Sequence, residues 1–162
     1  MKNKNLSFMT QAAMIAAIYV VLTYIFAPFS FGEVQVRISE ALTILPIFTP
    51  AAIPGLFAGC LIGNILGGAI LPDIVFGSIA TLIGAFFTWK LREQKPVTAT
   101  LPPIISNIVI VPFVLRYGYG VTLPIPFMML TVGIGEVISC TVLGLIVYGA
   151  LKKYQHTLFR AV

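Results

Sequence analysis

Apolar residues along this chain gather into long blocks that are separated by short polar segments. A helix needs about 20 apolar residues to cross the hydrocarbon core of a membrane. Because proline lacks a backbone donor and disfavours helix just before itself, Pro46, Pro50 and Pro54 divide the apolar stretch between residues 38 and 70. The pattern predicts an all-α integral membrane protein, a single transmembrane domain over residues 1–162 with six helices, at approximately 8–27, 39–48, 52–69, 73–89, 97–115 and 126–151.

Composition excludes a soluble domain. The chain is 59% hydrophobic and 9% charged, whereas soluble domains carry roughly 25% charged residues. A chain of this size cannot enclose so much apolar surface in one core. We therefore expect a multi-pass protein of the cell membrane. Cys60 and Cys140 stand alone within apolar segments, which favours buried free thiols over a disulfide.

The basic residues predict the orientation of the helices. Six crossings with a cytoplasmic N-terminus bring the C-terminus back to the cytoplasm, and only Arg37 and Arg116 then lie outside. This arrangement satisfies the positive-inside rule, and the net charge of +5 reflects topology rather than nucleic-acid binding. The inner basic residues would be Lys2, Lys4, Lys90, Arg92, Lys95, Lys152, Lys153 and Arg160.

Two carboxylates lie within predicted helices. Glu40 and Glu136 interrupt apolar segments, where a charge is costly unless it meets a partner, a cavity or a ligand. Glu40 has a structural alternative, an ion pair with Arg37 three residues earlier. Glu136 has another, a protonated carboxyl group bonded to a neighbouring helix. We interpret both as candidate ligand-binding residues, together with Arg37.

Three further polar residues join them. Asn64 and Asn107 lie within predicted helices, where amides also serve simply to hold helices together. Asp73 follows Pro72 at the start of a helix, so a helix N-cap explains it without any function. Under the predicted topology most of these side chains come from different helices and lie in the outer half of the membrane. They predict a polar cavity that opens to the outside.

The first predicted helix carries alanines four residues apart. Ala12 and Ala16 share one face of the helix, and Ala13 and Ala17 share another. Because these side chains are small, another helix can approach either face closely. The partner helix belongs either to this chain or to another protein.

Enzyme signatures are absent from the sequence. There is no P-loop, no cysteine cluster and no Ser–His pair, and the only histidine is His156 in the tail. We expect no catalytic residue, no metal site and no cofactor in this chain, and any ATP hydrolysis must occur in other proteins.

Four motifs resemble those of the QueT family, which comprises substrate-binding S components of energy-coupling factor (ECF) transporters assigned to queuosine precursors. They lie at residues 35–42, 50–56, 59–64 and 133–136. The resemblance implies a six-helix S-component fold with a site closed by outer loops, and two separate ATPase subunits. It also implies that Ala12, Ala13, Ala16 and Ala17 dock onto a transmembrane coupling subunit. Pro112 stands where a small residue is expected, which departs from the family pattern.

The ligand that the resemblance implies is a 7-deazaguanine base. Adjacent N–H donors along its edge suit a carboxylate, its carbonyl suits an amide or a guanidinium, and an aminomethyl substituent suits a second carboxylate. The residues alone would equally serve another polar heterocycle or vitamin-like ligand. A stand-alone proton-coupled carrier using Glu136 and a purely structural membrane subunit are the other hypotheses.

Overall fold

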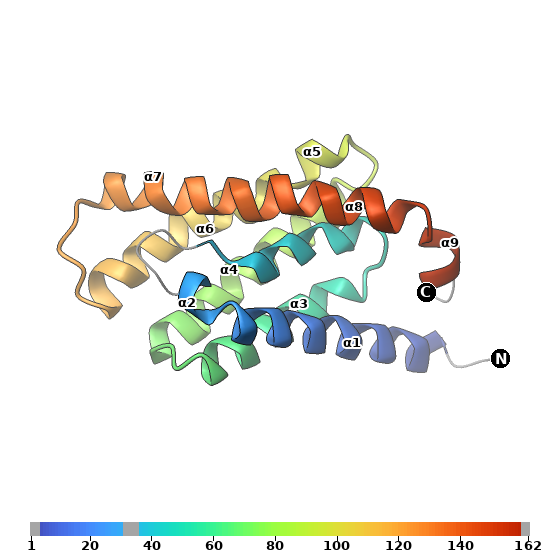
Figure 1. Ribbon diagram of the computed structural model, residues 1–162, viewed down its shortest axis with the longest axis horizontal. Coiled ribbons are helices and arrows are strands. Elements are labelled where there is room, and N and C mark those ends of the chain that lie inside the picture. The colour runs from blue at the N-terminus through green and yellow to red at the C-terminus, as the bar shows by residue number, and fades with distance from the viewer. Residues whose placement is uncertain (1–3, 31–35, 160–162) are drawn as a thin grey trace.

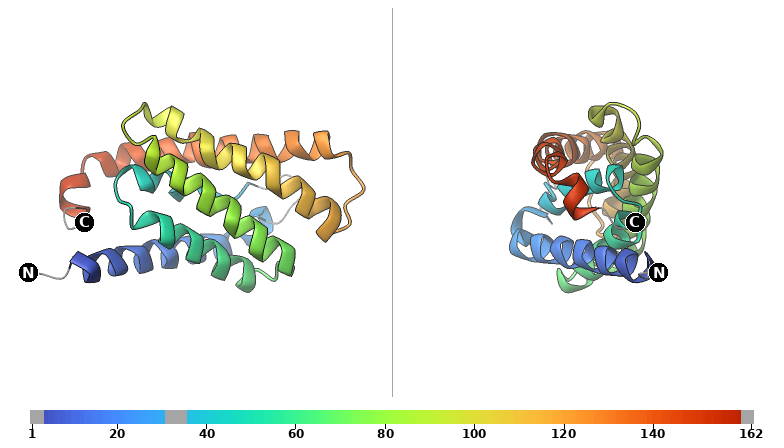
Figure 2. Two further views of the ribbon diagram at one scale, coloured as in Figure 1. Left: turned by 180° about the vertical axis from the view of Figure 1, so that it is seen from behind. Right: turned by 90° about the vertical axis from the view of Figure 1, so that its right-hand side faces the viewer.

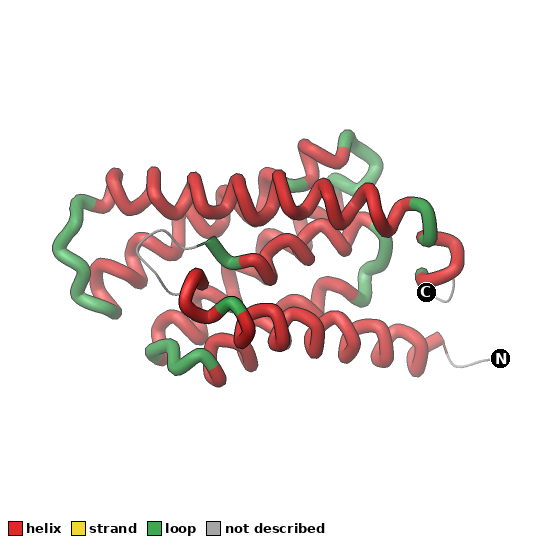
Figure 3. Tube along the Cα trace, in the orientation of Figure 1, coloured by secondary structure: helices red, strands yellow, loops and turns green. Residues whose placement is uncertain are grey.

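The structure is a computed structural model that describes residues 4–30 and 36–159. Within these ranges the chain is helical and contains no strand (Figure 3). Gln35 of the first motif and the basic residues Lys2 and Arg160 lie outside the described residues. The elements are α1 (Lys4–Ile25), α2 (Ala27–Ser30), η1 (Ile38–Ile47), α3 (Ala52–Leu66), α4 (Leu71–Lys90), α5 (Pro96–Ala99), α6 (Leu101–Phe113), η2 (Val114–Gly118), α7 (Ile125–Glu136), η3 (Val137–Leu143), α8 (Gly144–Lys152) and α9 (Gln155–Leu158).

Four helical segments are long and apolar enough to cross a membrane. They are Lys4–Ile25, Leu71–Lys90, Pro96–Gly118 and Ile125–Lys152, and the last two join several consecutive elements into one helix. Figure 1 shows these helices running along the long axis of the bundle. The prediction of a helical multi-pass membrane protein is confirmed. Because η1 and α3 are shorter, six crossings and cytoplasmic termini stay predictions.

The helix ends differ from the predicted ones in ways that proline and glycine explain. The first helix begins at Lys4 and stops at Ile25, and Pro28 lies within the separate turn α2. The third ends at Leu66 rather than residue 69, since Gly68 adopts a left-handed φ of 75° that terminates it. The alternative explanation of Asp73 as a helix N-cap is wrong. The cap of α4 is Ile70, with no side-chain capping bond, and Asp73 lies inside the first turn.

The second predicted helix is a 3₁₀-helix, η1, with Pro46 near its end. It lies inside the bundle, between α1 on one side and the α7–α8 helix on the other (Figures 1 and 2). Every residue from Ser39 to Pro46 is buried, and η1 contacts α1, α4, η3 and α8. The polar residue Glu40 is therefore placed at the centre of the molecule rather than at its edge.

Two stretches of π-helix interrupt the long helices. Pro112 lies inside α6, where it removes a backbone donor, and the helix widens into η2 two residues later. A second widening, η3, follows directly after Glu136. Single-turn π-helical bulges occur frequently at functional sites.

Small residues bring α1 and α3 into direct contact. A Cβ added to Gly55 would lie 2.7 Å from the carbonyl oxygen of Ala12, and one added to Gly59 would lie 3.1 Å from Cα of Ala16. Ala16 is buried, whereas Ala13 and Ala17 face outward and are exposed. The two alanine pairs therefore differ: Ala12 and Ala16 pack inside the chain, and Ala13 and Ala17 remain open to a partner.

Single cysteines test the predicted orientation. Cys60 and Cys140 are buried, so we expect labelling to come from an introduced cysteine at an exposed position. Arg92→Cys should react with an impermeant maleimide only after the membrane is opened, and Tyr117→Cys, at an exposed position, should react in intact cells. The reverse pattern would overturn the predicted orientation.

The contact between α1 and α3 predicts a contrast between neighbouring alanines. Ala16→Leu should lower the free energy of unfolding by about 1–3 kcal/mol, because the larger side chain meets Gly59. Ala17→Leu should change it by less than about 0.5 kcal/mol, because its surroundings are open. Unfolding of both variants in detergent measures this, and equal losses would contradict the packing described.

Candidate functional site

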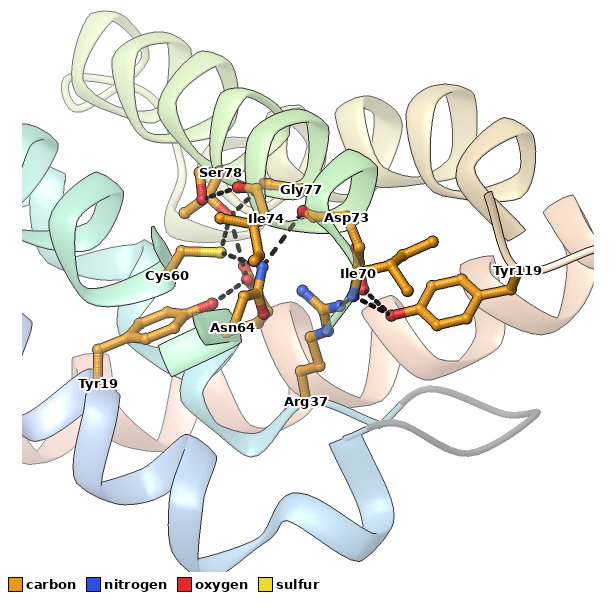
Figure 4. Close-up of polar contacts among 12 residues, drawn as sticks. Tyr19, Arg37, Cys60, Asn64, Ile70, Asp73, Ile74, Gly77, Ser78 and Tyr119 are labelled. Carbon is orange, nitrogen blue, oxygen red and sulfur yellow. Dashed lines mark hydrogen bonds and ion pairs between the residues drawn. The ribbon is translucent and has the colours of Figure 1, made fainter. Parts of the chain in front are cut away.

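Polar side chains that are shielded from the surroundings gather around η1. Tyr19 of α1, Glu40 of η1, Asn64 of α3 and Asp73 of α4 each expose no more than 2% of their surface, and Arg37 exposes 4%. Figure 4 shows Tyr19 entering this cluster from one side while Arg37 lies on the other side of Asn64. Ionised groups are stable inside a protein only when other polar groups surround them. This cluster supplies such surroundings.

Glu40 lies at the meeting point of three helices. Its Oε1 accepts hydrogen bonds from the hydroxyl groups of Tyr19 in α1 and Thr81 in α4, the latter at 3.3 Å. Its Oε2 is buried and has no hydrogen-bond partner among the described residues. A buried carboxylate oxygen without a donor is costly, so Oε2 is a position where a ligand donor would be stabilised.

Arg37 and Asp73 form the second part of the cluster. Arg37 Nη2 lies 3.5 Å from Asp73 Oδ2, and the guanidinium is also close enough to attract the Glu40 carboxylate. The sequence raised an ion pair between Arg37 and Glu40, and the ion pair at contact distance joins Arg37 to Asp73. Asp73 Oδ1 is buried without a hydrogen-bond partner among the described residues, so it is a second oxygen that lacks a donor.

Asn64 and Gly77 shape the space beside this ion pair. The Asn64 amide donates to the carbonyl oxygen of Asp73 at 3.4 Å. A Cβ added at Gly77 would lie 3.1 Å from Asp73 Oδ1 and 3.3 Å from Asn64 Nδ2. The absence of a side chain at Gly77 therefore keeps a methyl group from pressing against these polar atoms, as the methyl group of alanine would.

Glu136 approaches the cluster from the α7–α8 helix. Its Oε2 accepts a hydrogen bond from the Cys140 thiol at 3.2 Å, and Asn107 of α6 is close enough to interact with the same carboxyl group. Carboxylate oxygens of Glu40 and Glu136 and the sulfur of Cys140 all lie within 4.8 Å of one another. The two membrane carboxylates that the sequence singled out are thus neighbours, although 96 positions separate them along the chain.

The charges of the cluster are unbalanced. Three buried carboxyl groups, Glu40, Asp73 and Glu136, accompany one buried guanidinium, Arg37. Two carboxylates at close range repel each other when both are ionised. N–H donors or a positive charge on a ligand would relieve this repulsion. The arrangement therefore suits a ligand with several donors.

The same atoms bear on metal binding. Glu40, Glu136 and Cys140 would offer two oxygens and one sulfur to an ion, and they form the metal-capable group found among the described residues. Thiolate ligands favour soft metals, and carboxylates favour hard ones. The expectation of no metal site stays a prediction.

The structure adds residues that the sequence reasoning missed. Tyr19, Thr81 and Cys60 lie in apolar runs with nothing to distinguish them, yet all three line the cluster around Glu40. Tyr119 donates a hydrogen bond to Asp73 at 2.9 Å. A hydroxyl group that faces a buried acid would have marked such a residue as part of the site. Recognising it requires knowing which helices are in contact, and the sequence does not show this.

Comparison with known proteins places these observations in a family. The family model described as "QueT transporter" matches residues 9–153, a range that includes all the site residues. The chain is also 33% identical over 84 residues to "Queuosine precursor transporter QueT" of Lactococcus lactis subsp. cremoris (strain MG1363), over 51% of this chain and 48% of that protein. No solved structure matches. Since the family model covers nearly the whole chain, this membrane protein belongs to the QueT transporter family.

Proposed function

We propose that this protein captures a queuosine precursor from the outside as the substrate-binding subunit of an ECF-type importer. The observation that carries the proposal is the buried, acid-rich cluster with open oxygens on Glu40 and Asp73. The transporter family and the name of the L. lactis relative support it. We take the ligand of the cluster to be a queuosine precursor because the relative is named as a transporter of one.

Glu40 is the group best suited to read the edge of a 7-deazaguanine base. One oxygen is held by Tyr19 and Thr81, so the carboxylate has a fixed orientation, and the other has no donor among the described residues. Adjacent N–H groups on the base would donate to such a carboxylate, and a hydrogen bond with one ionised partner is among the stronger kinds. The base carbonyl would accept from Arg37 or from an amide of Asn64 or Asn107.

Glu136 would recognise the substituent of the base. It lies beside Glu40, and Cys140 and Asn107 are its polar neighbours. An aminomethyl group carries a positive charge near neutral pH, and that charge would offset the repulsion between Glu40 and Glu136. A neutral cyano substituent would offset none of it.

Energy for uptake would come from partners. The sequence has no ATP-binding motif, so two ATPase subunits and a transmembrane coupling subunit would supply and transmit it. Ala13 and Ala17 are exposed on α1, and such small residues allow a second helix to approach closely. This face of α1 is the proposed docking surface for the coupling subunit.

A proton-coupled carrier that works alone is the second candidate. The observation that favours it is the proximity of Glu40 and Glu136, because two neighbouring carboxyl groups can share and exchange a proton. Uptake of the base into liposomes containing this protein alone, driven by a proton gradient, would support the carrier. Uptake that requires the ATPases and ATP would support the ECF importer.

Replacing the central carboxylates should weaken ligand binding. Glu40→Gln turns one acceptor oxygen into a donor that faces a ligand N–H, and an unmatched buried polar group costs about 1–3 kcal/mol. The dissociation constant for 7-aminomethyl-7-deazaguanine should rise roughly 5- to 150-fold. Glu136→Gln should weaken this base more than the 7-cyano base, because only the former carries a cation. Calorimetry on purified variants measures both effects.

The matched control is Glu93→Gln, at a glutamate with 84% of its side chain exposed. It should leave both dissociation constants unchanged. Near-wild-type affinity in the Glu40 and Glu136 variants would remove these carboxylates from the ligand site.

Blocking the exposed alanine face should separate binding from transport. The double change Ala13→Leu with Ala17→Leu should abolish ATP-dependent uptake in the complete transporter while ligand affinity stays within about twofold. Val21→Leu, at another exposed position of α1, should leave uptake intact. If the double variant loses ligand binding as well, the alanines serve the fold rather than a partner.

A further inference from the structure

Tyr119 connects an exposed loop to the buried ion pair. It follows η2, in the segment that leads to α7, and 42% of its surface is exposed. Its hydroxyl group donates to Asp73 Oδ2 at 2.9 Å and accepts a hydrogen bond from the backbone N–H of Ile70 at 3.4 Å. Figure 4 shows the Tyr119 ring reaching toward Asp73 and Ile70 from the side opposite Tyr19. Tyr119 is therefore the outer end of a polar chain that continues inward through Asp73 and Arg37.

The loop that carries Tyr119 is braced within itself. Arg116 Nη1 donates to the carbonyl oxygen of Val121 at 3.2 Å, and the backbone N–H of Val121 donates to the carbonyl oxygen of Leu115 at 3.0 Å. Gly118 packs so closely on Ile70 that an added Cβ would lie 2.8 Å from its Cδ1. A movement of Tyr119 would therefore carry this braced segment away from the start of α4.

Asp73 has one oxygen engaged and one open. Oδ2 is shared between Arg37 and Tyr119, and Oδ1 is buried without a partner among the described residues. A carboxylate held through one oxygen keeps the other in a fixed direction. Partial burial and the charge of Asp73 raise the pKa of the Tyr119 phenol, so the hydroxyl group retains the proton that it donates.

We infer that Tyr119 is a positioning residue that orients Asp73 in the ligand site and ties the loop at residues 118–124 to it, so that breaking the Tyr119–Asp73 bond is a step in ligand exchange. This inference rests on the proposed function for the role of Asp73 toward the ligand. The tie between the loop and α4 stands on the geometry alone.

The first test removes only the hydroxyl group. Tyr119→Phe should increase the dissociation rate of 7-aminomethyl-7-deazaguanine roughly tenfold, the effect of losing one hydrogen bond to a charged group. The association rate should stay the same or rise, because opening becomes easier. Tyr117→Phe is the matched control, since Tyr117 is 78% exposed on the same segment, and it should leave both rates unchanged. An unchanged dissociation rate in Tyr119→Phe would overturn the positioning role.

The second test needs no ligand. Backbone amides at residues 119–123 should exchange hydrogen faster in Tyr119→Phe than in Tyr117→Phe. In an Asp73→Ala background, adding Tyr119→Phe should cause a smaller further increase, because the bond to Asp73 is already absent and only the bond from the Ile70 N–H remains to be lost. Equal exchange in the two tyrosine variants would overturn the tie between loop and site. If the wild-type protein binds neither the aminomethyl nor the cyano base, the proposed function fails while this exchange experiment still decides the inference.

Discussion

Ionisable side chains buried in a molecule surrounded by lipid must find their partners inside it. Glu40, Asp73, Glu136 and Arg37 are each at least 96% shielded, so they depend on polar groups of the protein for hydrogen bonds and charge compensation. The helices are consequently arranged so that hydroxyl, amide and thiol groups from five segments reach them. Tyr19, Thr81 and Cys140 are the clearest cases, because each lies on a different helix and hydrogen-bonds a buried acid. The apolar side chains packed around this cluster cannot supply these hydrogen bonds.

Close packing of backbones makes that convergence possible. Tyr19 reaches Glu40 from α1, and α1 lies near enough because Gly55 and Gly59 offer no side chains to hold it away. Ala12 and Ala16 lie on the side of α1 that contacts α3, and Ala13 and Ala17 lie on its exposed side. One helix therefore presents a small-residue face on two sides, one for the fold and one that is free.

The sequence predicted the helices and the buried acids because both depend on local signals. Apolar blocks, prolines and the cost of a charge in lipid are visible without knowledge of the fold, so Glu40 and Glu136 were recognisable at once. Their proximity was not, since a separation of 96 positions along the chain reveals nothing about distance in space. The alternative explanation of Asp73 as a helix N-cap was wrong because the helix begins two residues earlier and the carboxylate forms an ion pair with Arg37. Gly77 and Tyr119 were missed because their importance arises only from neighbours on other segments.

The shortness of η1 and α3 has a consequence for how the protein enters its membrane. Ten residues of 3₁₀-helix extend about 20 Å and fifteen of α-helix about 22 Å, both less than the roughly 30 Å hydrocarbon core. Neither helix is therefore long enough to cross the hydrocarbon core by itself, and η1 also carries Glu40. During synthesis α1, η1 and α4 emerge before the α7–α8 helix, which carries Glu136 and Cys140. A chain that stops before α7 therefore already contains the Tyr19 and Thr81 partners of Glu40, and the α7–α8 helix then adds a second carboxyl group beside it.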